Sequence, residues 1–303
     1  MSSKGLMNMG TGSNVRTHWC LERALSGCAA LAVVLLHGAH GAEAATAGHA
    51  AKLVPHRAVY DVELDRSHAG SGIVGLKGRM VFEFTGSDCE GWTQNMRLVT
   101  QMRNRDDQAS VTDLRSSSWE ASSGDRFRFN SSTYQNRKLT ESTAGDATRG
   151  DGDAAVKVHL TKPKQNVLEL PREVMFPVQH SIALLEAAAQ GERSLQVVLY
   201  DGSDQGQKAF DTTAFISQSY PPGSQTDLSP VTNADRLKAL ASWHVAISYY
   251  ERKGKRDEGT PSYEMTFRYY ANGVTRRLFI DYGDFAIKGA LKEIEFLEPG
   301  HCD

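Results

Sequence analysis

The chain has 303 residues, of which 40% are hydrophobic and 23% are charged, and this balance is typical of a folded globular protein. Its formal net charge of −2 at pH 7 shows no excess of lysine and arginine. Because nucleic-acid binding depends on clustered basic side chains that neutralise phosphates, we expect no nucleic-acid partner.

Residues 1–44 have the three-part pattern of a secretory signal peptide. Basic residues such as Arg16 and Arg23 come first, an apolar run follows at residues 28–36, and small residues surround Ala44. The run is much shorter than the about 20 residues of a membrane-spanning helix. We therefore expect cleavage after Ala44, export to the periplasm and no transmembrane span in the mature protein.

Two other interpretations of this region are weaker. The tetrapeptide ending at Cys28 imitates the box at which bacterial lipoproteins are processed, but the apolar stretch follows Cys28 instead of preceding it. An N-terminal helix packed on the domain is disfavoured because the flanks of the run lack helical periodicity. We expect residues 45–56 to form a flexible leader and residues 57–303 to form a single β-rich domain.

From Arg57 onward, apolar and polar residues alternate, which predicts half-buried strands. One face of each segment is apolar and the other is charged or polar. The apolar sets are Tyr60, Val62 and Leu64; Met80, Phe82 and Phe84; Trp92, Met96 and Leu98; Phe127 and Phe129; Val156, Val158 and Leu160; and Leu195, Val197 and Leu199.

One helix interrupts the strands. Pro177 suits a first helical position and Gly191 a helix end, and an apolar stripe at helical spacing lies between them. The stripe consists of Val178, Ile182, Leu185 and Ala189. We expect this helix to cover one face of the sheet, and we expect a shorter helical piece within residues 232–240.

Asn272-Gly273 predicts a hairpin, because both positions tolerate a positive φ and the flanking residues alternate. Pairing Ala271 with Val274 places Phe267, Met265 and Tyr263 opposite Leu278, Ile280 and Tyr282 on a core face. The reverse face then holds Arg268 opposite Arg277 and Glu264 opposite Asp281, which predicts a wall open to solvent or to a wet cavity.

The spacing from Leu291 to Ile294 predicts a bulge in a last strand, and loops are expected at 145–153 and 221–230. No strand-helix alternation occurs. The sequence therefore predicts a mainly β domain: a single antiparallel sheet, strongly curved or partly closed like a half-open barrel, with one principal covering helix.

Two cysteines, Cys89 and Cys302, remain after removal of the signal peptide. In an oxidising compartment two cysteines predict one disulfide, which would tether the C-terminus. The alternative is a pair of unpaired buried thiols, which is disfavoured because Cys302 lies next to a chain end.

Several ordered phrases resemble the EipB family of cell envelope integrity proteins, long carried as a domain of unknown function. The phrases are CEGWTQNMR at 89–97, FPVQH at 176–180, YDGSDQG at 200–206, PSYEM at 261–265, NGV at 272–274 and DYGDF at 281–285. The resemblance implies a periplasmic protein with a spiral sheet similar to the LolA and LolB lipoprotein carriers. It also implies a Cys89–Cys302 disulfide, a role in the alphaproteobacterial envelope and a tetratricopeptide-repeat protein as partner.

The sequence contains none of the common catalytic or metal-binding motifs that we searched for. No G-x-S-x-G, H-E-x-x-H or C-x-x-C pattern occurs, so we assign no catalytic residue, no metal site and no cofactor. His180 lies near the helix start, and we expect its ring to bond a neighbouring loop instead of a metal. The Asp201-Gly202 segment is best explained as a hairpin or bulged turn.

Because no catalytic or metal-binding motif was found, we expect the protein to act by binding a ligand or a partner. Our leading hypothesis is a non-enzymatic envelope protein whose curved sheet binds a lipid or lipoprotein ligand, with a candidate groove or lid formed by Val178, Ile182, Leu185, Trp92 and Phe176. The second hypothesis is a pure protein-interaction module with a filled core. An envelope hydrolase is third, because no activated nucleophile can be assembled.

Overall fold

The structure is a computed structural model, and it describes residues 52–152, 154–224, 228, 231–252, 259–300 and 302. The predicted signal peptide, its cleavage site after Ala44 and residues 45–51 of the predicted leader lie outside the described residues. Within the described part, no helix combines the length and apolar character needed to cross a membrane.

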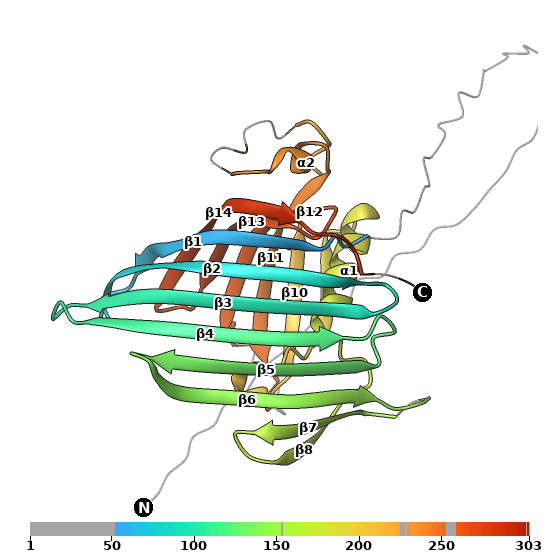
Figure 1. Cartoon of the computed structure of the whole chain (residues 1–303), viewed down its shortest axis with the longest axis horizontal. Helices are drawn as coiled ribbons and strands as arrows, with labels where there is room; N and C mark the ends of the chain where they lie inside the picture. Colours follow the sequence, from blue (N-terminus) through green and yellow to red (C-terminus); the bar gives the residue numbers. More distant parts are fainter. Residues whose placement is uncertain are drawn as a thin grey trace, which may run out of the picture. The chain divides into compact units, whose positions relative to one another are not determined.

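The described residues form one antiparallel sheet, shown in Figure 1, whose strands follow the order β8-β7-β6-β5-β4-β3-β2-β1-β14-β13-β12-β11-β10-β9. The strands are β1 (His56–Ser67), β2 (Ile73–Ser87), β3 (Gly91–Asn104), β4 (Ala109–Glu120), β5 (Arg126–Gln135), β6 (Lys138–Arg149), β7 (Val156–Lys162), β8 (Asn166–Leu170), β9 (Ser194–Leu199), β10 (Phe210–Ile216), β11 (Ser242–Glu251), β12 (Tyr263–Tyr270), β13 (Thr275–Asp281) and β14 (Phe285–Phe296). The helices are α1 (Pro177–Ala189), α2 (Asp235–Lys238) and the 3-10 turn η1 (Asp204–Gly206).

Every neighbour in the sheet is also a neighbour in sequence except β1 and β14, which pair at its middle. Strands β1–β6 lie in front of β10–β13 in Figure 1, so the sheet bends back over itself. The segment before α1 pairs with the β9 edge of the sheet, because the Met175 N–H donates to the Val198 carbonyl (2.7 Å) and the Met175 carbonyl accepts from the Tyr200 N–H (2.9 Å). The predicted curved antiparallel sheet with one principal helix is confirmed.

The predicted alternation is also confirmed, since the apolar side of each strand faces the inside of the bend. The largest cluster joins α1 to β2, β3 and β9–β12, and it includes Phe84, Trp92, Leu185, Val245 and Phe267. A second cluster, where β5, β6 and β7 meet the segment before α1, contains Phe127, Phe129, Val156, Val158 and Phe176. Burial of these apolar faces drives the sheet to curve around α1.

The hairpin between β12 and β13 has the predicted register only at its far end. Met265 pairs with Ile280, but near the turn Arg268 pairs with Arg276 instead of Arg277. The Tyr270 carbonyl accepts from the Gly273 N–H, and Gly273 has a φ of +86°, so the turn has three residues with glycine in the left-handed position. A bulge at Arg277 (φ +58°) restores the register beyond it.

The solvent-facing wall predicted for the reverse side of this hairpin is confirmed at Glu264 and Arg277, which are exposed, and is wrong at Arg268, which is only 2% exposed. The segment around Tyr220 covers it: the Arg268 guanidinium lies 4.0 Å from the centre of the Tyr220 ring. Its Nη2 also donates to Nε2 of His244 at 2.6 Å. A covering segment distant in sequence thus converts a surface position into a buried one.

Four other predicted features, namely a bulge, a hairpin, a short helix and a loop, can be compared with the structure. The bulge between Leu291 and Ile294 is confirmed, since the β1–β14 register shifts there. The hairpin at Asp201-Gly202 is confirmed by the antiparallel pairing of β9 with β10. A short helix, α2, lies within residues 232–240 as expected, and the described part of 221–230 is a loop.

The loop predicted at 145–153 is wrong over its first residues, because β6 continues to Arg149. Gly145 lies within this strand, where a Cβ would meet the His159 carbonyl oxygen at 2.8 Å and the Phe129 ring at 2.9 Å. Glycine is therefore needed for close packing and not for a turn. The domain also begins before Arg57, since Leu53 and His56 are buried.

Candidate functional site beneath helix α1

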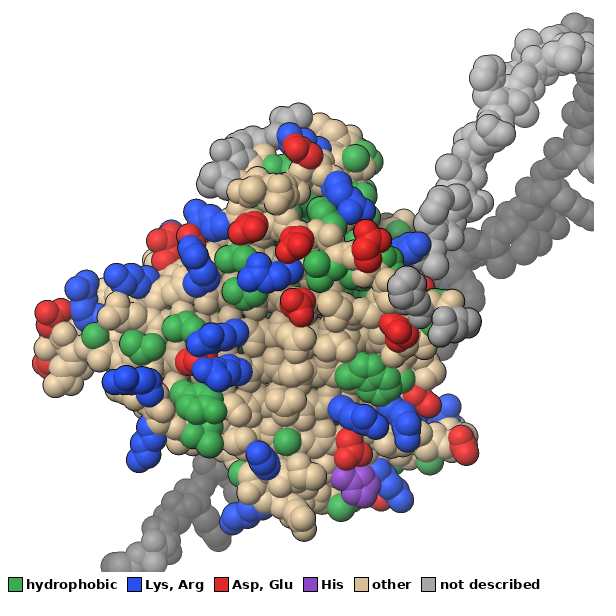
Figure 2. Space-filling view, in the orientation of Figure 1, with side chains coloured by type: hydrophobic (Ala, Val, Ile, Leu, Met, Phe, Trp, Pro, Cys, Tyr) green, Lys and Arg blue, Asp and Glu red, His purple; other side chains and the backbone are tan. Residues whose placement is uncertain are grey.

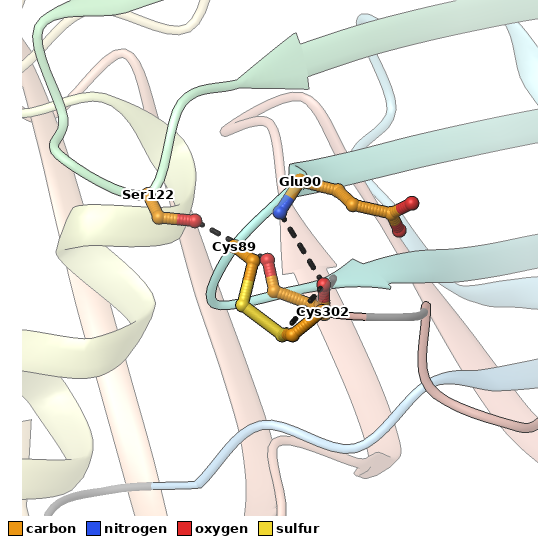
Figure 3. The surroundings of a disulfide bond; sticks show 5 residues. Cys89, Glu90, Ser122 and Cys302 are labelled. Atoms are coloured by element: carbon orange, nitrogen blue, oxygen red, sulfur yellow. Dashed lines mark hydrogen bonds between the residues drawn. A yellow bond between two sulfur atoms is a disulfide. The ribbon is translucent and has the colours of Figure 1, made fainter.

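The disulfide joins the turn between β2 and β3 to the tail that follows β14 (Figure 3). The Cα atoms of Cys89 and Cys302 lie 5.6 Å apart, within the usual range for a disulfide. The Gly300 N–H donates to the Gly86 carbonyl (3.2 Å), which aligns the tail with this turn. The Ser122 hydroxyl donates to the Ser87 carbonyl (3.2 Å), so the β4–β5 connection is attached to the same turn.

Helix α1 begins where the sequence predicted. Pro177 occupies its first turn, and the Phe176 N–H donates to Oε1 of Gln179 at 3.2 Å. These features satisfy or remove backbone donors that an isolated helix start would leave without partners.

Four of the five candidate groove or lid residues lie together. Val178, Leu185 and Trp92 are buried in the largest core cluster, and Ile182 packs at its margin. Trp92 stacks on Phe84 with ring centres 4.8 Å apart. Phe176 lies in the second cluster, where its ring stacks on Phe127 at 5.1 Å.

Helix α1 presents a slightly different face from the one predicted. Ala189, assigned to the apolar stripe, is exposed. Leu184 and Ala188 are buried instead, next to Leu185. The contact face of the helix is rotated because β9 and β10 pack beside it as well as β2 and β3.

A buried carboxylate from β4 holds the start of α1. Glu120 is 2% exposed, and it accepts hydrogen bonds from the backbone N–H groups of Val178 (2.7 Å) and Gln179 (2.9 Å). Burial raises the pKa of Glu120 to about 7, against the lowering effect of the two N–H donors and of Arg149. Glu120 is therefore a helix anchor whose charge changes near neutral pH.

Arg149, at the end of β6, fixes the segment that leads into the helix. Its guanidinium donates to the carbonyl oxygens of Val174 (2.8 Å) and Arg172 and lies 5.5 Å from the centre of the Phe176 ring. Together, Glu120 and Arg149 attach both sides of the helix entry to the sheet.

His180 differs from our expectation. The residue is 5% exposed within α1, and its Nε2 is buried with no hydrogen-bond partner among the described residues. The predicted bond from the ring to a neighbouring loop is therefore absent at this atom. Burial lowers the pKa of His180 to about 4, because the charged imidazolium would lose its hydration.

A small cavity lies under the second turn of α1. Its volume is about 40 Å³, and its lining includes Leu53, His56, Gln94, Ser181 and Tyr269. Cavities that hold drug-sized ligands reach about 300 Å³ or more, whereas ordered water needs far less room. This cavity fits water and is too small for an acyl chain.

Sequence reasoning missed two of these residues. Counting in steps of two from Leu114 places Glu120 on the inward face of β4, so the alternation of the sequence could have identified Glu120 as a buried carboxylate. Arg149 gave no such signal, because its role depends on the carbonyl groups of a segment that follows β8.

The fold and this inner face define a class of protein: a β-barrel-like, disulfide-linked domain built from one curved sheet around a single main helix. The chain belongs to the EipB-like family, whose sequence profile matches residues 47–298. It is 39% identical over 260 residues to cell envelope integrity protein EipB of Brucella abortus, covering 86% of this chain and 90% of that protein.

A solved structure supports the same assignment. The crystal structure of a β-barrel-like protein of domain of unknown function DUF1849, also from Brucella abortus, aligns with a TM-score of 0.74 and 36% identity. The alignment covers 82% of this chain and 100% of that one. The kinship supports a role of this chain in cell envelope integrity.

Proposed function

We propose that this protein maintains the cell envelope from the periplasm as a non-enzymatic interaction module, binding an envelope protein through its outer surface while its inner face serves as a core. One observation carries the proposal: helix α1 occupies the inside of the bend. Val178 and Leu185 pack directly against the sheet, and the cavity beneath Ser181 has a volume of only about 40 Å³. The tetratricopeptide-repeat partner implied by the family resemblance is the first protein to test.

Chemical cross-linking in cells followed by affinity purification tests this function. We expect a stoichiometric periplasmic partner, and we expect native mass spectrometry of the purified protein to give the mass of the polypeptide after signal-peptide cleavage. A reproducible lipid adduct, or hydrolysis of an envelope substrate by the purified protein, contradicts the proposal.

A second function, binding of an acyl chain beneath a displaced α1, is favoured by a separate observation. The start of α1 depends on Glu120, whose burial raises its pKa to about 7, and His180 is buried within the helix with a partnerless Nε2. Both make the attachment of α1 less stable than a wholly apolar contact.

A disulfide that ties α1 to the sheet distinguishes the two functions. If the helix acts as a lid, a variant locked in this way would lose lipid binding and envelope function and regain both on reduction, relative to the parent reduced in the same way, because reduction also opens the Cys89–Cys302 disulfide. If the inner face is only a core, the locked variant retains envelope function in either redox state.

A further inference from the structure

A shallow hollow lies on the outer face of the sheet, across β2–β5, on the opposite side from α1. Its volume is about 330 Å³, and it is lined by Val81, Glu83, Asn95, Met96, Arg97, Arg115, Ser116, Ser117 and Asn130. Figure 2 shows this face of the molecule, where a largely uncharged surface at the centre is bordered by both basic and acidic side chains.

Strand register explains the hollow. Glu83 pairs with Asn95, Asn95 with Ser117, and Ser117 with Asn130, so these four positions form one row across four strands. With strands about 4.8 Å apart, the row spans about 14 Å. Ser117, one of the two inner positions of this row, has a short side chain. The adjoining row carries the long side chains of Arg97 and Arg115, so the surface is depressed beside these arginines.

The two arginines are held in place. Arg97 lies directly opposite Arg115 in the β3–β4 pairing, an arrangement of like charges that needs a counter-ion. Asp113 supplies it, accepting from Nε and Nη2 of Arg97 (both 2.9 Å) and from Nη2 of Arg115 (2.7 Å). These bonds, to Arg97 first and then to Arg115, lower the pKa of Asp113 to about 2. Arg115 also lies 5.0 Å from the centre of the Tyr134 ring.

The polar groups of the row have bonding capacity left. The Ser117 hydroxyl donates to Oδ1 of Asn95 (2.7 Å), which leaves the Asn95 NH₂ group as a donor that points away from this bond. The Asn130 amide is exposed. The Glu83 carboxylate makes no hydrogen bond or ion pair with any described residue.

Each acidic group in or beside the hollow has a basic neighbour: Asp113 accepts from both Arg97 and Arg115, and Glu83 lies opposite Arg57 of β1. A polyanion such as nucleic acid or an anionic lipid surface binds to many uncompensated basic side chains, whereas the two arginines of this hollow already share Asp113. What it offers is a dense mixture of fixed donors and acceptors across a slot wide enough for more than one sugar ring. Such a mixture suits a ligand with many hydroxyl or acetamido groups and no net charge.

We propose that this hollow binds a neutral oligosaccharide, with Glu83, Asn95 and Asn130 bonding its hydroxyl or acetamido groups and the fixed guanidinium groups of Arg97 and Arg115 donating to its oxygens. Because the arginines are already ordered by Asp113, little side-chain entropy is lost on binding. Sugar binding here would not depend on which protein docks elsewhere or on what α1 covers.

Titration with neutral tetrasaccharides, followed by backbone amide NMR shifts, tests the site. The probes are tetra-N-acetylchitotetraose, maltotetraose and, as a charged counterpart, a heparin tetrasaccharide. We expect at least one neutral probe to shift amides of β2–β5 around the hollow, and we expect the heparin tetrasaccharide to bind no more tightly.

Matched variants assign the binding to the hollow. Asn95→Leu removes an amide from the row, whereas Gln101→Leu makes a similar change on the same face of the same strand, about 20 Å away. We expect Asn95→Leu to weaken binding of the neutral probe at least tenfold and Gln101→Leu to leave it unchanged. Thermal unfolding of both variants verifies that they are folded.

Three results overturn the inference: no amide shift with either neutral probe at millimolar concentration, equal weakening by both variants, or tighter binding of the heparin tetrasaccharide. Binding of the protein to anionic phospholipid vesicles with no response to the neutral probes also overturns it, because the surface would then recognise a membrane and not a sugar.

Discussion

Replacement of Glu120 by glutamine should change how stability depends on pH. The parent carboxylate is buried and accepts two N–H groups at the start of α1. Glutamine has almost the same shape but no charge at any pH, and its one oxygen can accept only one of the two bonds in the same way. Glu120→Gln therefore removes a titration and keeps the side-chain volume, and the loss of one hydrogen bond lowers the stability of the variant by an amount that does not depend on pH.

Whether the free energy of unfolding rises or falls with pH depends on the direction of the Glu120 pKa shift. In the unfolded chain the Glu120 pKa is the ordinary value of 4.5, and in the folded protein it is raised to about 7. The folded state thus retains its proton over a range in which the unfolded state has lost it. The stability that this proton contributes is fully present below pH 4.5 and is lost as the pH rises through 7.

The magnitude is at most about 3 kcal/mol, because a Glu120 pKa raised from 4.5 to about 7 corresponds to about 1.36 kcal/mol for each tenfold change in proton affinity. The free energy of unfolding of Glu120→Gln, relative to the parent, should rise by up to this amount between about pH 4 and pH 8. Taking the difference cancels the contributions of the histidines, which titrate in both proteins.

Urea unfolding at a series of pH values measures this difference, with the slope of the free energy on urea held as a check on two-state behaviour. Hydrogen exchange of the Val178 and Gln179 amides, which donate to the carboxylate, gives a local measurement of the same anchor. Parallel profiles for parent and variant would refute the reasoning. So would a parent that gains stability over the variant as the pH rises, because the two N–H donors would then outweigh burial.

Three further predictions follow from the same core. His180→Gln should diverge from the parent in the opposite direction: burial lowers the pKa of His180 from 6.5 to about 4, so the parent alone loses up to about 3 kcal/mol as the pH falls through this range, and a difference independent of pH would contradict this. Cys302→Ser should lower the melting temperature in oxidising buffer only, because the disulfide closes a separation of 213 residues and contributes at most about 5 kcal/mol in the chain-entropy model. Equal melting temperatures of parent and variant in both oxidising and reducing buffer would count against the bond. Leu185→Ala should cost about 2–5 kcal/mol in denaturant unfolding, since Leu185 is 2% exposed, and a loss below about 1 kcal/mol would mean that α1 is not part of the core.

The candidate site divides into a part that local pattern predicted and a part that it did not. The spacing of Val178 and Leu185 and the proline before them identified a covering helix, because helical periodicity and capping are properties of a short stretch of sequence. The anchors of that helix, Glu120 and Arg149, come from strands far from it in the chain. Their roles required the three-dimensional arrangement.

The hairpin of β12 and β13 shows the same division within one motif. The turn was located by Asn272-Gly273, but the three-residue loop and the bulge at Arg277 moved the register near the turn by one residue. Arg268 was placed on a surface by strand alternation, and the Tyr220 segment then covered it. Alternation tells which residues share a face, and it does not tell what packs on that face.

By itself, then, the sequence determined the strands, the main helix, the pair of cysteines and the family, because each depends on local periodicity, on turn chemistry or on phrases of a few residues. Only the tertiary structure decided that α1 fills the bend, that the carboxylate of Glu120 is buried beneath its first turn, and that Asn95, Ser117 and Asn130 line an open hollow on the outside. The physical reason is that burial and its electrostatic consequences depend on which surfaces meet, and those surfaces are contributed by segments that no local pattern connects.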